Sequence, residues 1–446
     1  MFLKNLKGAG KKILPFKPYI YNSELVDIKD VVSPPYDVID EKLQDNLYKK
    51  SDFNIIRLEL GKEFSGDNKG DNRYSRANGY FKDWIKRGIL KLENENSIYI
   101  YIQKFAVSGV LYERIGFISL FALNKADEDD SGGNNNSIYG HEMTLSKPKE
   151  DRFNLMEATK ANFSPIFSIF EDKDLNVLNI LTGSIKSAAA KKIFDFKDDS
   201  NTEHILYRIS DESIIKSIQN EMDRKSFYIA DGHHRFETCV NFRNYIRKNG
   251  ISGVNADTCM MYFAPSNQKG LIILPTHRCI VNKKIELEAF LDEIKADFNI
   301  RKVDLKDLPK ETKKAGENSA SFGFAHNSGN NFILSFKNNK TGKDAERQKS
   351  PLESLDVSIL ENYVLKKALK ISRDDIDNQR YLIYEKDAGR ALEKLNDGVV
   401  NAVFFMNPTK IEDVIKIASQ NLRMPQKSTF FYPKIITGLT INPLIS

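Results

Sequence analysis

The side chains best suited to chemistry lie in one short run, Asp231-Gly232-His233-His234-Arg235. The apolar segment 227–230 precedes this run, and apolar residues at helical spacing follow it as far as Gly250. A strand, a glycine turn and the start of a helix expose backbone N–H groups and the positive end of the helix dipole. Such a turn binds anions, so we expect a phosphate group to lie against it.

The side chains of this turn suit a phosphate ligand. Gly232 lets an anion approach the backbone closely, and the planar guanidinium of Arg235 can hold two phosphate oxygens. His233 and His234 offer donors or proton-transfer groups near neutral pH. The alternative is a helix start whose histidines only bind nearby carbonyl groups. Zinc binding by the two histidines is disfavoured, because adjacent side chains diverge at a helix start.

The elements around the turn predict an α+β or α/β architecture. Segments rich in β-branched and aromatic residues predict strands at 97–102, 115–123, 166–170 and 399–406. Helical spacing predicts helices at 41–48, 286–297, 355–369 and 410–419, and residues 321–325 and 332–336 predict a hairpin. A lysine-rich stretch, 302–318, predicts a joint between lobes.

We expect three parts along the chain. Residues 1–12 form a basic N-terminal extension, and residues 13–285 form the core with an insertion. Within the core, the acidic and asparagine-rich segment 124–137 predicts a mobile, exposed loop. Residues 286–446 form a C-terminal mixed α/β lobe, whose segment 424–438 contributes to the site.

The composition favours a cytoplasmic protein that is neither a membrane protein nor a nucleic-acid binder. The 446 residues carry 67 Lys and Arg against 61 Asp and Glu, and this excess is too small for a nucleic-acid wrapping surface. Three cysteines without a C-x-x-C pair exclude a disulfide scaffold. No apolar stretch reaches the ~18 residues of a spanning helix. No P-loop motif and no G-x-G-x-x-G after a strand occur, which disfavours P-loop and dinucleotide enzymes.

The turn also carries a family resemblance. Residues 229–235, IADGHHR, resemble the signature turn of the ParB/sulfiredoxin superfamily, and most closely its free serine kinases. Near the C-terminus, Pro408-Thr409-Lys410, a helix and then Pro425-Gln426-Lys427-Ser428-Thr429 resemble the tail of those kinases. The resemblance implies a kinase-like α/β core with large insertions, in which the D-G-H-H-R turn holds the phosphates of the donor.

Nearly the whole chain also resembles a large bacterial family known only as a conserved domain of unknown function. The segments that carry this resemblance are 33–38 (SPPYDV), 141–142 (HE), 149–152 (KEDR), 161–167 (ANFSPIF), the turn at Asp231, 274–278 (LPTHR) and 425–438. Between Asp37 and Asp231 the chain is far longer than a serine kinase.

The resemblance implies a small-molecule kinase that phosphorylates the hydroxyl of free L-serine to give O-phospho-L-serine. ADP, ATP or pyrophosphate would be the donor, and it would travel with Mg²⁺, for which Asp231 is the candidate ligand. Such a transfer needs a base to orient the acceptor hydroxyl. Asp37 matches the catalytic glutamate of the kinases, Glu142 is the second candidate, and His234 is a third catalytic residue. Asp37 as a helix cap is the alternative.

Other polar residues extend the predicted site. We expect the donor phosphates to be bound by the turn and by further basic or hydroxyl side chains, namely Lys149, Arg152, Lys427, Ser428 and Thr429, with Lys434 in the same tail. We expect the acceptor to be bound beside two strands, by Asn162, Ser164, Thr276, His277 and Arg278. A solvated charged face and surface salt bridges are the alternatives for these charges.

Two other classes of function compete with the kinase. A ParB-like regulator that binds CTP and DNA would need a helix-turn-helix with a basic face, and apolar strands follow Gly250 instead. A phosphometabolite-binding protein without turnover would bind the same phosphate and release no product. A sulfiredoxin-like reductase is disfavoured, because such chemistry needs a cysteine where His233 and His234 stand.

Overall fold

The computed structural model describes residues 11–123, 137–144, 146–337 and 350–445. The predicted N-terminal extension and the predicted loop therefore lie almost wholly outside the described residues. The chain divides into two compact units. Unit 1 comprises residues 1–140, 144–272 and 433–446, and unit 2 comprises residues 141–143 and 273–432. We predicted a boundary at 285/286, whereas the units divide at 272/273 and the last segment of the chain belongs to unit 1.

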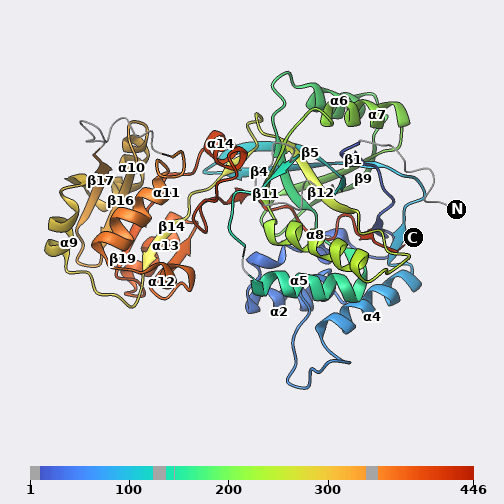
Figure 1. The fold of residues 1–446 in the computed structure, drawn as a ribbon, viewed down its shortest axis with the longest axis horizontal. Coiled ribbons are helices and arrows are strands. Elements are labelled where there is room, and N and C mark those ends of the chain that lie inside the picture. Colours follow the sequence, from blue (N-terminus) through green and yellow to red (C-terminus); the bar gives the residue numbers. More distant parts are fainter. Residues whose placement is uncertain (1–10, 124–136, 145, 338–349, 446) are drawn as a thin grey trace. The chain divides into compact units, whose positions relative to one another are not determined.

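Unit 1 is built on a mixed nine-stranded sheet in the order β6-β11-β8-β12-β5-β4-β10-β9, with β1 beside β5 (Figure 1). Its longest strands, β4 (Ile98–Val107) and β5 (Val110–Ala122), form an antiparallel hairpin. The other strands of this sheet are β1 (Ile13–Leu14), β6 (Ile138–Tyr139), β8 (Ile166–Phe170), β9 (Lys191–Lys197), β10 (Glu203–Ile209), β11 (Phe227–Asp231) and β12 (Thr258–Pro265). Two small sheets pair β2 (Tyr19–Tyr21) with β3 (Leu90–Leu92) and β7 (Ala161–Asn162) with β21 (Asn442–Pro443).

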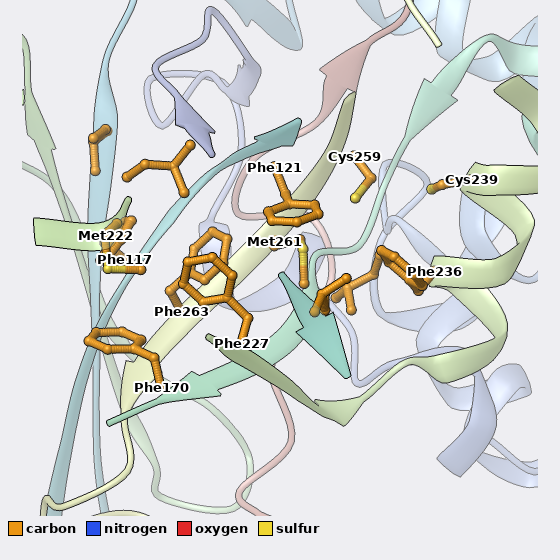
Figure 2. Close-up of a cluster of buried hydrophobic side chains, with 14 of the residues drawn as sticks. Phe117, Phe121, Phe170, Met222, Phe227, Phe236, Cys239, Cys259, Met261 and Phe263 are labelled. Atoms are coloured by element: carbon orange, nitrogen blue, oxygen red, sulfur yellow. The ribbon is translucent and has the colours of Figure 1, made fainter. Parts of the chain in front are cut away.

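One face of the large sheet carries the hydrophobic core of unit 1. Because side chains alternate along a strand, Phe117 and Phe121 of β5 point to this face together with Met261 and Phe263 of β12. Figure 2 shows these rings packed against Phe227 of β11 and close to the cysteines of the core. Helices α6 (Asn176–Lys186), α7 (Glu212–Met222) and α8 (His233–Lys248) contribute their apolar faces to the same cluster.

Polar side chains occupy the other face of the sheet. Gln103, Arg114 and Tyr262 alternate with core residues on their strands, and each of the three is fully buried. The C-terminal segment 433–445 crosses unit 1, and we call it the C-terminal strap. Its backbone is paired with Ser33 at Thr437 and with Tyr19 at Ile441. The strap is therefore held by backbone hydrogen bonds along most of its length.

Successive helices form a layer beside α8 (Figure 1). Helix α5 (Ser146–Thr159) packs on α8, α4 (Arg73–Lys86) packs on α5, and the short α3 (Ile56–Glu59) packs on α4. The remaining helices of unit 1 are α1 (Ile28–Val31), the 3₁₀ turn η2 (Tyr36–Val38) and α2 (Glu41–Lys50). This layer brings the N-terminal third of the chain beside the predicted phosphate turn.

Unit 2 contains an antiparallel six-stranded sheet in the order β15-β17-β16-β19-β14-β18. Its strands are β14 (His277–Ile280), β15 (Phe298–Lys302), β16 (Ser321–His326), β17 (Asn331–Phe336), β18 (Leu382–Glu385) and β19 (Ala402–Phe405). Its helices are α9 (Leu287–Ile294), η4 (Leu305–Asp307), α10 (Leu308–Gly316), α11 (Asp356–Ile359), η5 (Leu360–Ala368), α12 (Arg373–Asp377), α13 (Ala388–Asn396) and α14 (Ile411–Ser419). The short strands β13 (Ile272–Ile273) and β20 (Phe431–Tyr432) complete the chain.

The α+β fold class is confirmed, and most predicted elements are present. The strands expected at 166–170 and 227–230, the hairpin of β16 and β17, and the helix after the turn all form. The joint predicted at 302–318 is wrong, because α10 forms there and packs on β16 and β17 inside unit 2. Within the described part of the chain, no helix has the length and apolar character needed to cross a membrane.

Candidate functional site

The Asp231 turn forms as a strand, a single glycine and a helix. Strand β11 ends at Asp231, Gly232 adopts φ +92°, and α8 begins at His233 without a side-chain cap. The positive φ is accessible to glycine at little cost. The first N–H groups of α8 and its positive dipole end are thus presented at this turn. These are the features that the sequence predicts for an anion site.

Asp231 is bracketed by two cations in unit 1. One of its oxygens, Oδ2, accepts a hydrogen bond from Arg235 Nη2 at 2.8 Å, and Oδ1 forms an ion pair with Lys434 Nζ. Arg235 is buried and donates its Nη1 to the carbonyl of Pro165 at 2.8 Å. A Cβ built on Gly232 would lie 2.9 Å from the Arg235 guanidinium. Glycine is therefore required here both for its φ and for the close approach of the arginine.

The polar face of the sheet positions the C-terminal strap that carries Lys434. Arg114 donates to the carbonyl of Pro433 at 2.5 Å, and Gln103 donates to the carbonyl of Lys434 at 3.0 Å. Burial lowers the pKa of Arg114, while neighbours that include Asp231 favour its charged form. Two fully buried side chains thus fix the backbone on which the Lys434 ammonium reaches Asp231.

A small cavity of about 40 Å³ lies beside this turn in unit 1. Arg235, Arg152, Glu59, Asn162 and Ser164 contribute its polar wall. A volume of this size holds on the order of three waters. The structure therefore brings two sequence-predicted acceptor residues, Asn162 and Ser164, to the same cavity as two predicted phosphate-binding arginines.

The cavity contains a buried network of paired charges. Glu59 is 3% exposed and lies 3.2 Å from Arg152 Nη1, and it also accepts a hydrogen bond from the Ser164 hydroxyl at 2.9 Å. Arg152 additionally binds Asp151, which in turn binds Arg73. Burial raises the pKa of Asp151, but the charges of Arg152 and Arg73 outweigh this effect and hold that pKa below its usual range. The network is neutralised internally.

Asp37 lies in the turn η2 and is exposed. Its neighbour Tyr36 packs under Arg152, whose guanidinium carbon is 4.1 Å from the ring centroid. Burial raises the pKa of Tyr36 to about 12, and the charges of Arg152 and Arg235 oppose that shift. The alternative role predicted for Asp37, that of a helix cap, is wrong. Asp40 is the residue that caps α2, because its side chain accepts a hydrogen bond from the Leu43 N–H.

Lys149 and His234 lie on the α5 and α8 helices. Lys149 donates to Glu237 at 2.9 Å, and Glu237 also accepts from the Thr144 hydroxyl. His234 is partly exposed in the first turn of α8, whereas His233 is buried. Lys149 is therefore engaged by a carboxylate of the helix that follows the turn, and it does not line the cavity.

Unit 2 contains a second group of predicted residues. The Thr429 hydroxyl lies 3.0 Å from Nε2 of the buried His141 and donates to Glu142 at 3.4 Å. The Met424 N–H donates to the carbonyl of His141 at 2.7 Å. The structure thus brings Glu142 together with Thr429 from the far end of unit 2.

Arg278 joins two other predicted segments of unit 2. It is 5% exposed and donates to the carbonyls of Thr276 and Lys427. Burial lowers its pKa, and in the described residues no carboxylate forms an ion pair with it. His277 accepts from the Met406 N–H, and burial together with the charge of Arg278 lowers its pKa to about 4. Ser428, also buried, donates to the carbonyl of Pro425.

Glu59 and Arg114 are the polar residues that the sequence did not single out. Glu59 stands in the largely apolar run 55–60, and Arg114 stands in a strand. A charged residue inside an apolar run is buried only when it has a partner. This pattern could have identified both residues from the sequence as buried and paired. Their partners lie far away in the sequence, at 152 and 433.

The donor set for Mg²⁺ is weak in this arrangement. Both carboxylate oxygens of Asp231 already face cations, Arg235 and Lys434. Among the described residues, no three His, Cys, Asp or Glu side chains cluster as a metal site. Asp231 therefore does not fit as a resident magnesium ligand while Lys434 is bound to it.

The fold and the site define an α+β protein in which a glycine turn joins a strand to the uncapped start of a helix. The chain belongs to the family described as "Protein of unknown function (DUF1015)", whose model matches residues 13–358. The last segment of unit 2 and the strap with Lys434 lie beyond the matched range.

Three solved structures illustrate what the chain is similar to. A free serine kinase in complex with AMP is 12% identical, with 69% of this chain and 88% of that chain covered and a TM-score of 0.36. A conserved hypothetical protein from Pyrococcus furiosus is 13% identical over 69% and 92%, at a TM-score of 0.34. C-terminally truncated SbnI from Staphylococcus aureus is 9% identical over 69% and 84%, at 0.33. No curated protein matches the chain significantly.

Proposed function

We propose that this protein is a phosphotransferase that moves a phosphoryl group from ADP, ATP or pyrophosphate to the hydroxyl of free L-serine. The observation that carries the proposal is the Asp231 turn, where a helix begins without a side-chain cap and the Asp231 carboxylate lies between Arg235 and Lys434. Backbone N–H groups and cationic side chains that stabilise the charge of the phosphoryl group are what phosphoryl transfer requires of a protein. The D-G-H-H-R resemblance to free serine kinases and to the ParB/sulfiredoxin superfamily supports the same assignment.

In this proposal the serine oxygen attacks the terminal phosphorus of the donor. The bond between that phosphorus and the bridging oxygen breaks, and the donor leaves as AMP, ADP or phosphate. The hydroxyl proton passes to a carboxylate, for which Asp37 is the first candidate and Glu142 the second, with His234 as a further proton carrier. O-phospho-L-serine is the product.

Phosphate binding at the turn would change the partners of Asp231. An incoming phosphate competes with the Asp231 carboxylate for Arg235 and Lys434, because both anions bind the same donors. Lys149, Arg152, Lys427, Ser428 and Thr429 are the further residues we propose for the donor. Mg²⁺ would be held mainly by phosphate oxygens, and Asp231 would join it only after Lys434 has been released.

The acceptor would bind with its polar groups toward the cavity of Glu59 and Arg152. Glu59 already accepts a hydrogen bond from a hydroxyl, that of Ser164, and an ammonium group would suit the same carboxylate. We propose Asn162, Ser164, Thr276, His277 and Arg278 as further acceptor contacts, and a cytoplasmic location for the reaction.

The test is the rate of O-phosphoserine formation, measured by mass spectrometry on the full chain with Mg²⁺, L-serine and each donor. We expect His234→Ala to lower this rate at least tenfold, whereas His204→Gln, which alters a histidine in another part of unit 1, should lower it far less. Arg235 is buried, so Arg235→Lys is preferred to Arg235→Ala. Binding of the donor without any product in the wild-type protein would instead support a phosphometabolite-binding protein.

A further inference from the structure

Unit 1 contains a second cavity, of about 270 Å³, bounded by α2, α3 and α4. Four cations contribute to its wall, and none of the residues that line it is acidic: Arg57, Lys62, Arg73 and Arg76. It shares no lining residue with the cavity of Glu59 and Arg152.

Exposed carboxylates outside the cavity hold two of these cations, Arg57 and Lys62, only weakly, whereas the other two are paired with carboxylates that are 16% and 20% exposed. Asp52 lies 2.9 Å from Arg57, but its side chain is 89% exposed. Asp45, the partner of Lys62, is about half exposed. An exposed ion pair of this kind contributes only about 0–1 kcal/mol. An anion entering the cavity would therefore replace these partners at little cost.

Aromatic rings complete the wall and orient the cations. The guanidinium carbon of Arg57 lies 4.4 Å from the Tyr48 ring centroid, and that of Arg76 lies 4.7 Å from the Phe64 ring centroid. The Tyr48 hydroxyl accepts from the Lys62 backbone N–H at 2.9 Å. Cations stacked on aromatic faces keep their N–H groups directed to the ring edge, where a ligand can reach them.

We infer that this cavity binds a small organic phosphomonoester. Arg57 and Lys62, whose carboxylate partners are exposed, match the charge of a dianionic phosphate, and a guanidinium group matches its oxygens in pairs. The rings of Tyr48, Phe64 and Tyr80 provide apolar surface for the organic part of the ligand. The volume is near the lower end of small-molecule sites, about 300 Å³.

The chain carries its own reporter for this cavity. Trp84 is the single tryptophan of the sequence, and its ring centroid lies 6.3 Å from that of Tyr80 on the same helix. Binding in the cavity should therefore change tryptophan fluorescence. We would titrate the full chain with phenyl phosphate and with inorganic phosphate, and with phenol as the uncharged control. We expect saturable changes with both phosphates and none with phenol.

Matched variants assign the signal to the cavity. Arg57→Gln and Lys62→Gln should each raise the Kd for phenyl phosphate about tenfold or more, since a hydrogen bond to a charged group is lost. Lys82→Gln removes the same charge from an exposed position of α4 and should leave the Kd within about twofold. His234→Ala should leave this titration unchanged, which separates the cavity from the Asp231 turn. An unchanged Kd in both cavity variants, or equal saturation by phenol, would overturn the inference.

Discussion

In unit 1 the buried charges of the candidate site are paired with one another, whereas in unit 2 the buried arginine of the predicted site is bound to neutral carbonyl groups. Glu59 has Arg152, and Asp231 has Arg235 and Lys434. Arg278 donates to the carbonyls of Thr276 and Lys427. We therefore expect the paired charges of unit 1 and Arg278 of unit 2 to respond differently to a ligand. Paired charges stabilise unit 1 and must exchange partners to bind a ligand, whereas Arg278 can accept an anion without such an exchange.

We expect the largest effect on stability from breaking a buried charge pair of unit 1. Glu59→Ala leaves Arg152 buried with only Asp151 to neutralise it, and breaking a buried pair in this way costs about 3–5 kcal/mol. The free energy of unfolding in urea measures the loss. Glu63→Ala is the control, because Glu63 is an exposed partner of Arg73 and its removal should cost under about 0.5 kcal/mol. Equal losses in the two variants would show that the burial of the Glu59 pair does not matter.

Acid should destabilise unit 2 through His277. The folded state holds the pKa of His277 at about 4, chiefly by burial, whereas the unfolded chain titrates near 6.5. The unfolded state therefore binds more protons between these values, and stability falls as the pH drops from about 6.5 to 4, by about 3 kcal/mol. His277→Asn keeps an acceptor for the Met406 N–H and should flatten this part of the profile. A wild-type profile that is already flat there contradicts the prediction.

The turn itself offers a matched pair of glycines. Gly232→Ala must adopt a positive φ and also displace the Arg235 guanidinium, so we expect a loss of about 2–3 kcal/mol. Gly250→Ala, after the other end of α8, has a positive φ but no atom within 4 Å of the new Cβ, and should cost about 1 kcal/mol. Thermal unfolding compares the two variants. If Gly250→Ala lowered stability as much as Gly232→Ala does, the contact between the new Cβ and Arg235 would make no contribution to the loss.

The smallest effect on stability is expected at Arg278. Arg278→Met removes a buried charge that no carboxylate pairs with in the described residues, so the free energy of unfolding should change by under about 1 kcal/mol. The same variant should weaken binding of L-serine, whose carboxylate we propose Arg278 to bind, at least tenfold, as measured by calorimetry. If Arg278→Met greatly lowered stability and left the affinity unchanged, Arg278 would have a structural role and no role in binding, which contradicts the prediction.

Local features were predictable from the sequence. The Asp231 turn could be predicted because a strand, a glycine and a helix start follow one another directly in the chain. The strap residue Lys434 was named with the tail, although its partner Asp231 lies 203 positions earlier. Elements such as β8, β16 and α14 also formed as expected, because their patterns of apolar residues are local.

Residues whose role depends on distant partners were not predictable in the same way. Glu59 becomes a site residue only through Arg152 and Ser164, about a hundred residues later. Arg114 depends on strand register, which places it on the polar face of the sheet. The grouping of residues 141–143 with unit 2 follows from the hydrogen bond between Met424 and His141. Such pairings are set by tertiary packing, on which local patterns carry no information.

The most direct test of the proposed reaction is phosphorus NMR of the wild-type full chain with Mg²⁺ and L-serine. ATP, ADP, CTP and pyrophosphate would be supplied in separate samples. The account predicts a new phosphomonoester resonance that coincides with added O-phospho-L-serine in at least one of the ATP, ADP or pyrophosphate samples. Absence of this resonance in all three, with CTP hydrolysed only when DNA is present, would contradict the kinase and favour the ParB-like regulator.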